Sequence, residues 1–225
     1  MNTPTPDVAE IKNVWQLLTV TDTSIIELRA ISPSGSSAPI TRHYRAENYK
    51  NTDALKAVFE RDAIRLNNDG YNIYTVMNPI RPEFSGKAAK DEHILHRKWL
   101  LIDLDKASSE KRPSTLAELD SAKALAKAIA EELKLQGWGD PGLVVMSGNG
   151  YHLYYDLGQM ANTTESTGLV QAALKELATS FDTSSVKVDR VVYNASRITK
   201  VVGTVARKGE NTPETPYRVA RMEQL

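Results

Sequence analysis

The chain has 225 residues, 41% of them hydrophobic and 25% charged, which is enough for one globular domain with a substantial core. Its 28 Lys and Arg residues balance 28 Asp and Glu residues, so any surface that attracts a polyanion has to be local. The absence of cysteine excludes disulfides, thiolate metal sites and a catalytic thiol. The apolar runs are too short for a membrane helix and the start lacks a secretory pattern, so we expect a cytoplasmic protein without a membrane partner.

The first 80 residues predict an α/β unit with short connections. Helical spacing of apolar residues predicts a helix over residues 6–18, followed by a strand over 23–32, a loop over 32–40 and a partner strand over 41–49. A second helix is predicted over 52–66, because "NNDG" follows it as a stop signal. A buried strand over 71–80 completes the unit.

The remainder predicts a strand, a long helix, a hairpin, a second helix and a strand. The strands are expected at 98–105, 142–148, 150–157 and 186–189, and the helices at 113–139 and 164–181. Thr115 and Glu118 stand in capping-box spacing, and Gly137 is a stop signal. The tail predicts a loop over 197–209 and a final strand over 216–222. This order is that of a split βαβ, or RNA-recognition-like, sheet, so we predict an α+β fold.

Two aspartates lie close together in "LLIDLDK". Side chains of a strand alternate between its faces, so Asp103 and Asp105 are expected on one face, roughly 6–7 Å apart. Two carboxylates at the end of a buried strand are costly unless a cation neutralises them, and Mg²⁺ and Mn²⁺ prefer carboxylate oxygens. The pattern alone leaves two interpretations open: a metal site, and a strand that ends with its aspartates in water.

A third aspartate, Asp189, ends the short segment "VKVD". By itself it is typical of a solvated turn residue. In a split βαβ sheet, however, this strand lies beside the strand of Asp103. Three acidic side chains would then share one face, which is the minimum for holding two divalent cations.

The stretch "SGNGYHLYYDL" places His152 directly after a small polar turn. Its glycines let the backbone approach a ligand closely, and Ser147 and Asn149 offer polar side chains. His152 would then bind a phosphate or donate a proton. A hairpin turn explains the glycines equally well, and the pattern alone slightly favours a structural histidine.

Residues 187–221 hold eight Lys or Arg and three acidic residues, a local excess of five positive charges. Arg197 and Lys200 lie three positions apart and would flank one anion, with the Arg supplying a bidentate contact. Charge runs of this kind are usually solvated faces. The position of this run directly after Asp189 favours a functional role.

Taken in order, "WLLIDLD", "SGNGYHLYY" and "VKVDRVVYNASRITKVVGTVARKG" resemble the archaeo-eukaryotic primase superfamily, in particular the primase–polymerase domains of phages, plasmids and mobile elements. That family is marked by an acidic pair on a strand, a small-residue-x-His motif and a later strand ending in Asp. The similarity extends upstream through "IYTVMNPIRPE" and "LHRKW" and covers roughly residues 65–221. The motifs are short singly but specific in this order.

The resemblance implies a nucleotidyltransferase that joins nucleoside triphosphates on a single-stranded DNA template, next to a primer. Asp103, Asp105 and Asp189 would hold two divalent cations, Mg²⁺ or Mn²⁺. His152 would contact the triphosphate. Further nucleotide contacts would be Ser147, Asn149, Arg197 and Lys200, and weaker sugar or template contacts would be Tyr193 and Asn194. The expected fold is one domain over 1–225, with an N-terminal α/β module over about 1–95 and an RNA-recognition-like catalytic core over about 96–225.

Members of the superfamily usually carry a helical accessory domain, and often a helicase, after the catalytic domain. This chain stops soon after its final predicted strand, so we expect an excised domain or a separate subunit, and primer extension rather than priming from scratch. Two other functions stay open. One is a non-catalytic module that binds single-stranded nucleic acid, which predicts the loss of a metal carboxylate; the other is a two-metal nuclease. The chain has no GxxxxGK[ST], HExxH or HxH motif, which disfavours P-loop, zinc and histidine-ligated nicking enzymes.

Overall fold

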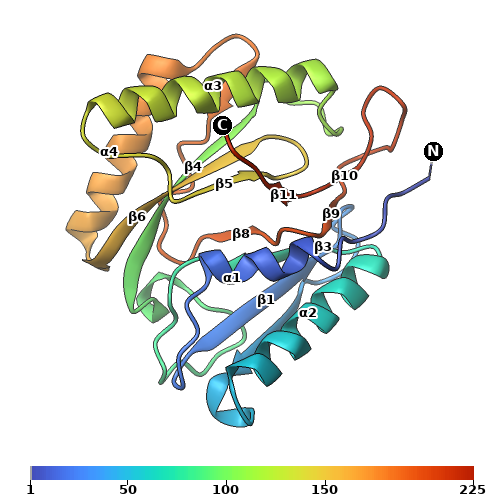
Figure 1. Cartoon of the computed structure of the whole chain (residues 1–225), viewed down its shortest axis with the longest axis vertical. Helices are drawn as coiled ribbons and strands as arrows, with labels where there is room; N and C mark the ends of the chain where they lie inside the picture. Colours follow the sequence, from blue (N-terminus) through green and yellow to red (C-terminus); the bar gives the residue numbers. More distant parts are fainter. Residues whose placement is uncertain (1) are drawn as a thin grey trace.

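Two antiparallel sheets form the centre of the protein in the computed structural model, which describes residues 2–225. Helices and strands are mixed along the chain, and every strand pair within the described residues is antiparallel. The protein is therefore α+β, as predicted. The helices α3 and α2 lie on opposite sides of the molecule with the strands between them (Figure 1).

The smaller of the two sheets has four strands in the order β2-β1-β3-β8. Their bounds are Ile25–Ile31 for β1, Ile40–Arg45 for β2, Asn72–Val76 for β3 and Ile198–Lys200 for β8. Helix α2 (Thr52–Asn68) packs against β1 and β3. It begins at Asn51, whose side chain accepts a hydrogen bond from the Ala54 N–H at 2.9 Å and so satisfies one of the free donors at the helix start.

The larger sheet has five strands in the order β11-β5-β6-β4-β7. Their bounds are His96–Lys106 for β4, Leu143–Met146 for β5, Tyr151–Ala161 for β6, Val186–Val188 for β7 and Arg221–Met222 for β11. Helix α3 (Leu116–Leu135) contacts β4 and β6, and α4 (Thr164–Phe181) contacts β7. The predicted hairpin of β5 and β6 around "SGNG" is confirmed.

The limits of the long helix follow from its sequence. The Thr115 hydroxyl accepts a hydrogen bond from Glu118 N–H at 3.1 Å, and the Glu118 carboxylate accepts one from Thr115 N–H at 2.7 Å. This reciprocal pair is the predicted capping box. The helix ends just before Gly137, which has a φ of +89°, a conformation that glycine adopts without strain.

The predicted helix over residues 6–18 is confirmed only over residues 10–17. The chain forms only a short 3-10 turn, η1 (Glu10–Asn13), followed by one turn of helix, α1 (Val14–Leu17). The reason lies at Asp7, whose N–H donates to the carbonyl of Gly203 at 2.8 Å and whose carboxylate accepts from the N–H groups of Ala9 and Glu10. The bond to Gly203 ties Asp7 to the C-terminal part of the chain, and the Asp7 carboxylate caps the short helical segment that follows, so the helical residues begin only at Glu10.

The tail also differs from its prediction. The expected loop over 197–209 contains β8 and β9 (Val205–Ala206), and the expected single strand over 216–222 is divided into β10 (Arg218–Val219) and β11. The break occurs because β10 pairs with β9 while β11 pairs with β5. Strands of two or three residues are too short for an alternating pattern to reveal. Two further 3-10 turns, η2 (Ala46–Asn48) and η3 (Asp91–His93), lie in connections.

The two sheets are linked through the chain and through the core. Strand β8, from the second half of the chain, completes the sheet of the predicted N-terminal module, so this sheet includes a strand from beyond the division expected near residue 95. One cluster of buried apolar side chains extends from Ile11 to Val202 and includes residues of both sheets. Within residues 2–225, no helix combines the length and apolar character needed to cross a bilayer.

Candidate active site

A cavity of about 490 Å³ lies between the two sheets and collects most of the predicted site residues. Its lining from the larger sheet includes Asp103, Asp105 and His152, and its lining from the smaller sheet includes Tyr74 and Lys200. The remaining predicted residues on its wall are Ser147, Asn149 and Arg197. A larger groove of about 940 Å³ lies between α3 and the C-terminal residues, but none of the predicted site residues lines it.

Strand register brings the acidic and histidine side chains together. In the antiparallel pair of β4 and β6, Asp103 lies directly opposite His152, so both side chains project from the same face of the sheet. Asp105 is two residues further along β4 and shares that face. Asp189 follows β7, and its N–H donates to the carbonyl of Asp103 at 2.8 Å. The predicted neighbourhood of the Asp103 and Asp189 segments is therefore confirmed.

The two cavity carboxyls are difficult to ionise together. Burial, and then the negative charge of Asp189, raise the pKa of Asp103 to about 7. Burial, and then the charge of Asp103, raise the pKa of Asp105 to about 6. The Asp103 Oδ1 atom is buried and accepts no hydrogen bond. The chain supplies no hydrogen-bond partner for this buried oxygen, and a bound cation would be a suitable partner.

The third carboxylate is occupied by protein contacts. The Asp189 Oδ1 atom accepts a hydrogen bond from Val191 N–H at 2.8 Å, and its Oδ2 atom accepts one from the Arg197 guanidinium at 3.4 Å. Over the described residues 2–225, no three acidic or histidine side chains are arranged as a ready-made metal centre. The structure thus brings two carboxylates into the cavity and places the third beside them, paired with Arg197.

His152 is buried with its two ring nitrogens in different surroundings. Its Nδ1 atom lies 3.1 Å from the Tyr154 hydroxyl and 3.4 Å from the Thr199 hydroxyl, while Nε2 lies 3.4 Å from Asp103 Oδ1. Burial, opposed by the negative charge of Asp105 and assisted by the positive charge of Arg197, lowers the pKa of His152 to about 4. The imidazole is therefore neutral near pH 7. The hydroxyls fix the ring and leave Nε2 on the side of the carboxylates.

The "SGNG" turn lines the cavity and also holds the hairpin together. The Ser147 hydroxyl lies 3.2 Å from both the N–H and the carbonyl of Gly150, and the Asn149 side chain accepts a hydrogen bond from Ser114 N–H at 3.2 Å. A side chain at Gly150 would collide with the Leu104 carbonyl and the Asp105 carboxylate. The second glycine is thus required by the close approach of the turn to β4.

The basic residues of the cavity are held by different partners. Arg197 contacts Asp189, as described above. The Lys200 ammonium is buried and donates to the Val205 carbonyl at 3.0 Å and to Asn72 Oδ1 at 3.4 Å. Burial, together with the positive charge of Arg207, lowers the pKa of Lys200 well below its ordinary value. Tyr193 and Asn194, predicted as weaker contacts, do not line the cavity.

Sequence reasoning missed several residues of the cavity wall, among them Tyr74, Arg207 and Lys208. Arg207 and Lys208 extend from β9 to the cavity, and Tyr74 projects from β3. The adjacent basic pair lies inside the basic run over 187–221, directly before Gly209. That position was the available signal. The sequence around Tyr74 gave no signal of a site, because an aromatic residue in a buried strand ordinarily belongs to the core.

The fold matches solved catalytic domains of primases and polymerases. The primase–polymerase domain of cyanophage S-2L aligns over 98% of this chain and 91% of its own length, with a TM-score of 0.57 and 18% identity. The primase RepB′ aligns over 96% of this chain and 56% of its own, with a TM-score of 0.51 and 15% identity. The polymerase domain of Mycobacterium tuberculosis ligase D, solved with DNA, aligns over 94% of this chain and 79% of its own length, with a TM-score of 0.52 and 16% identity.

No family model and no curated protein matches the sequence. At 15–18% identity, the structural matches define the fold alone. They place the chain in the class of α+β domains found in primases and polymerases. More narrowly, the chain has the archaeo-eukaryotic primase fold, as its motifs predicted.

Proposed function

We propose that the protein is a template-dependent nucleotidyltransferase of the primase–polymerase type, which joins nucleoside triphosphates on single-stranded DNA. The observation that carries this proposal is the pair of buried carboxyls, Asp103 and Asp105, facing a neutral His152 in the cavity between the sheets of this fold. A carboxylate pair next to a cavity open to a triphosphate is the arrangement that phosphoryl transfer requires.

Divalent cations fit this cavity chemically. The donor set consists of carboxylate oxygens, which Mg²⁺ and Mn²⁺ prefer, and Asp103 Oδ1 is buried without a hydrogen-bond partner. We propose that Asp103 and Asp105 hold the ions and that Asp189 joins them when Arg197 releases it. A bound cation supplies charge neutralisation for the transferred phosphoryl group.

The other residues of the cavity bind and orient the nucleotide in this proposal. His152, held at Nδ1 by the Tyr154 and Thr199 hydroxyls, presents Nε2 to the triphosphate. Arg197 exchanges Asp189 for a phosphate oxygen and gives a charge-assisted contact. Ser147 and Asn149 hold the turn against the nucleotide. Lys200, on the cavity wall, donates to the Val205 carbonyl and so supports the segment that begins there.

We further infer that the unit β4-α3-β5-β6-α4-β7 is the predicted split βαβ, RNA-recognition-like core. The strand order β5-β6-β4-β7 supports this inference, because the first and third strands of such a unit are central neighbours. With the N-terminal sheet it would form one catalytic domain over 1–225. The core cluster shared by both sheets supports a single unit.

We propose a DNA template and primer as partners, in replication of a phage, plasmid or mobile element. The similar ligase D polymerase domain was solved with DNA, and the cyanophage domain is a primase–polymerase. The chain spans 56% of the RepB′ primase that it matches. This share fits the proposal that a helical accessory domain or a helicase acts together with this chain.

A primer-extension assay tests the proposal. A labelled primer on a longer DNA template is incubated with the four deoxynucleotides or ribonucleotides, with and without Mg²⁺ or Mn²⁺. We expect extension only with a divalent cation, and its loss in an Asp103→Asn, Asp105→Asn double variant that unfolds at the same urea concentration or higher. Extension at the wild-type rate by that variant would refute the assignment, and shortening of the primer would favour the nuclease.

A further inference from the structure

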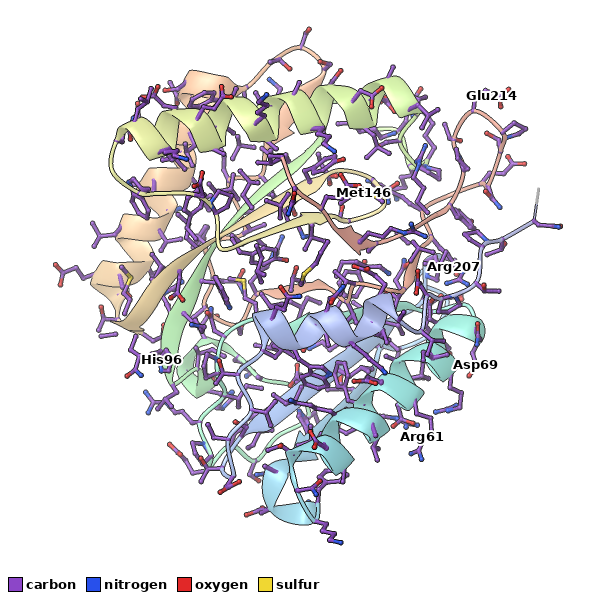
Figure 2. The ribbon with its side chains drawn as sticks, in the orientation of Figure 1. Arg61, Asp69, His96, Met146, Arg207 and Glu214 are labelled. Carbon is purple, nitrogen blue, oxygen red and sulfur yellow. The ribbon has the colours of Figure 1, made fainter. Side chains whose placement is uncertain are left out.

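A short segment of the tail, residues 205–208, forms part of the cavity wall. Ala206, Arg207 and Lys208 all line the cavity, whose wall also includes Asp103 and Asp105. Figure 2 labels Arg207 at the base of the loop whose outer end carries Glu214. The segment follows β8 in the chain by only a few residues, yet it was predicted as plain loop.

Two asparagines fix the backbone of this segment. Asn67 accepts a hydrogen bond from Val205 N–H at 2.8 Å and donates one to the Val205 carbonyl at 3.0 Å. Asn72 accepts from Arg207 N–H at 2.8 Å and donates to the Arg207 carbonyl at 2.7 Å. Each amide thus binds both polar groups of one residue, as a neighbouring strand would. Asn67 is fully buried and Asn72 is 7% exposed, so the clamp excludes water.

The segment presents positive charge that the chain does not neutralise. Arg197 is paired with Asp189, but neither Arg207 nor Lys208 forms an ion pair with any acidic residue among residues 2–225. The Nη1 atom of Arg207 is buried without a hydrogen-bond partner. A buried guanidinium donor without an acceptor is costly, and such donors ordinarily meet one.

Lys208 lines the same cavity as the carboxylate pair. Asp103, Asp105 and Lys208 all form part of its wall. An anionic ligand in this cavity can therefore meet the Lys208 ammonium as well as the ions that the carboxyls would hold. The cavity between them, about 490 Å³, is roomy enough for a polyphosphate chain.

We propose that Arg207 and Lys208 form a polyphosphate-binding pair for the incoming nucleotide, and that Asn72 is the residue that positions this pair. The proposal rests on the proposed function, because it assigns a role within the same cavity. Lys208 gives the anion a mobile ammonium, and Arg207 gives it a donor that the protein leaves unpaired. Asn72 acts through the backbone of residue 207, whose N–H and carbonyl its side-chain amide holds.

Calorimetric titration with inorganic tripolyphosphate in Mg²⁺ tests the pair without any reaction. We expect Lys208→Gln to bind tripolyphosphate about tenfold more weakly than the wild type, since one charge-assisted contact is removed. Lys175→Gln, a change at an exposed lysine of α4, is the matched control and should bind as the wild type does. No binding by the wild type, or equal binding by wild type and Lys208→Gln, would overturn the proposal.

A double-variant cycle tests the positioning role of Asn72. If Asn72 positions the pair, Asn72→Ala weakens tripolyphosphate binding, and adding Lys208→Gln to it costs less than Lys208→Gln costs in the wild type. Fully additive losses would assign Asn72 a purely structural role. The Lys208→Gln result decides the binding pair even if Asn72→Ala fails to fold.

Primer extension with the same variants separates the two proposals. A wild type that extends primers, with an unchanged nucleotide KM in Lys208→Gln, overturns the binding pair and leaves the proposed function standing. A wild type that binds tripolyphosphate through Lys208 but extends no primer supports the binding site and overturns the proposed function.

Discussion

Gly150→Ala is expected to separate the hairpin turn from β4 and to disturb the carboxylate pair. A Cβ atom at this position would lie 2.0 Å from the Leu104 carbonyl oxygen and 2.8 Å from Asp105 Oδ1. An ordinary contact needs 3.4 Å, so the turn or the strand must move by about 1.4 Å. The obstacle is backbone of a central strand, which cannot rotate away as a flexible side chain would.

The displacement should reduce both stability and activity. Overpacking of a rigid site costs about 1–3 kcal/mol in the free energy of unfolding. Urea unfolding measures this cost, and primer extension under conditions in which the variant is folded measures the effect on the site. Gly168→Ala is the matched control, because this helical glycine of α4 has open space around it and alanine favours the helix by up to about 1 kcal/mol. A Gly150→Ala variant with wild-type unfolding midpoint and extension rate would refute the reasoning.

Three further predictions concern the caps, a buried network and the histidine. Thr115→Ala should lower the free energy of unfolding by about 1 kcal/mol in urea, because α3 loses its capping bond. Glu27 is fully buried; burial raises its pKa, but hydrogen bonds from His43, Ala89 N–H and Arg29 outweigh it and hold the pKa below 4.5. Glu27→Gln should therefore cost about 2–3 kcal/mol at pH 7, a difference that shrinks as the pH falls below 4.5, and an undiminished difference at pH 3 would contradict this account. His152→Gln should raise the nucleotide KM about tenfold in primer extension if Nε2 contacts the triphosphate, and an unchanged KM would exclude that contact.

The predictions from sequence succeeded where one element carries its own signal. The capping box at Thr115 and the glycines around Asn149 are local patterns, and both the helix and the hairpin were located correctly. The face shared by Asp103 and Asp105 follows from strand alternation alone. The proximity of Asp189 required a topology, and the split βαβ arrangement predicted from the order of the elements supplied it.

The missed features depend on contacts between distant parts of the chain. The helix expected from residue 6 begins only at Glu10, and Asp7 before it bonds to Gly203, almost 200 residues away. The 205–208 segment owes its place to Asn67 and Asn72, two asparagines that read in sequence as helix-stop and strand residues. Burial of Lys200 was equally hidden, because a lysine in a basic run is ordinarily solvated.

The most direct test of the central claim is whether the template dictates the product. Four DNA templates that differ only in the first unpaired base are incubated with primer, Mn²⁺ or Mg²⁺, and each nucleotide separately. We predict that the wild type adds the complementary nucleotide on each template and that the Asp103→Asn, Asp105→Asn variant adds none. Addition that ignores the template base, or no addition by the folded wild type, would contradict the account.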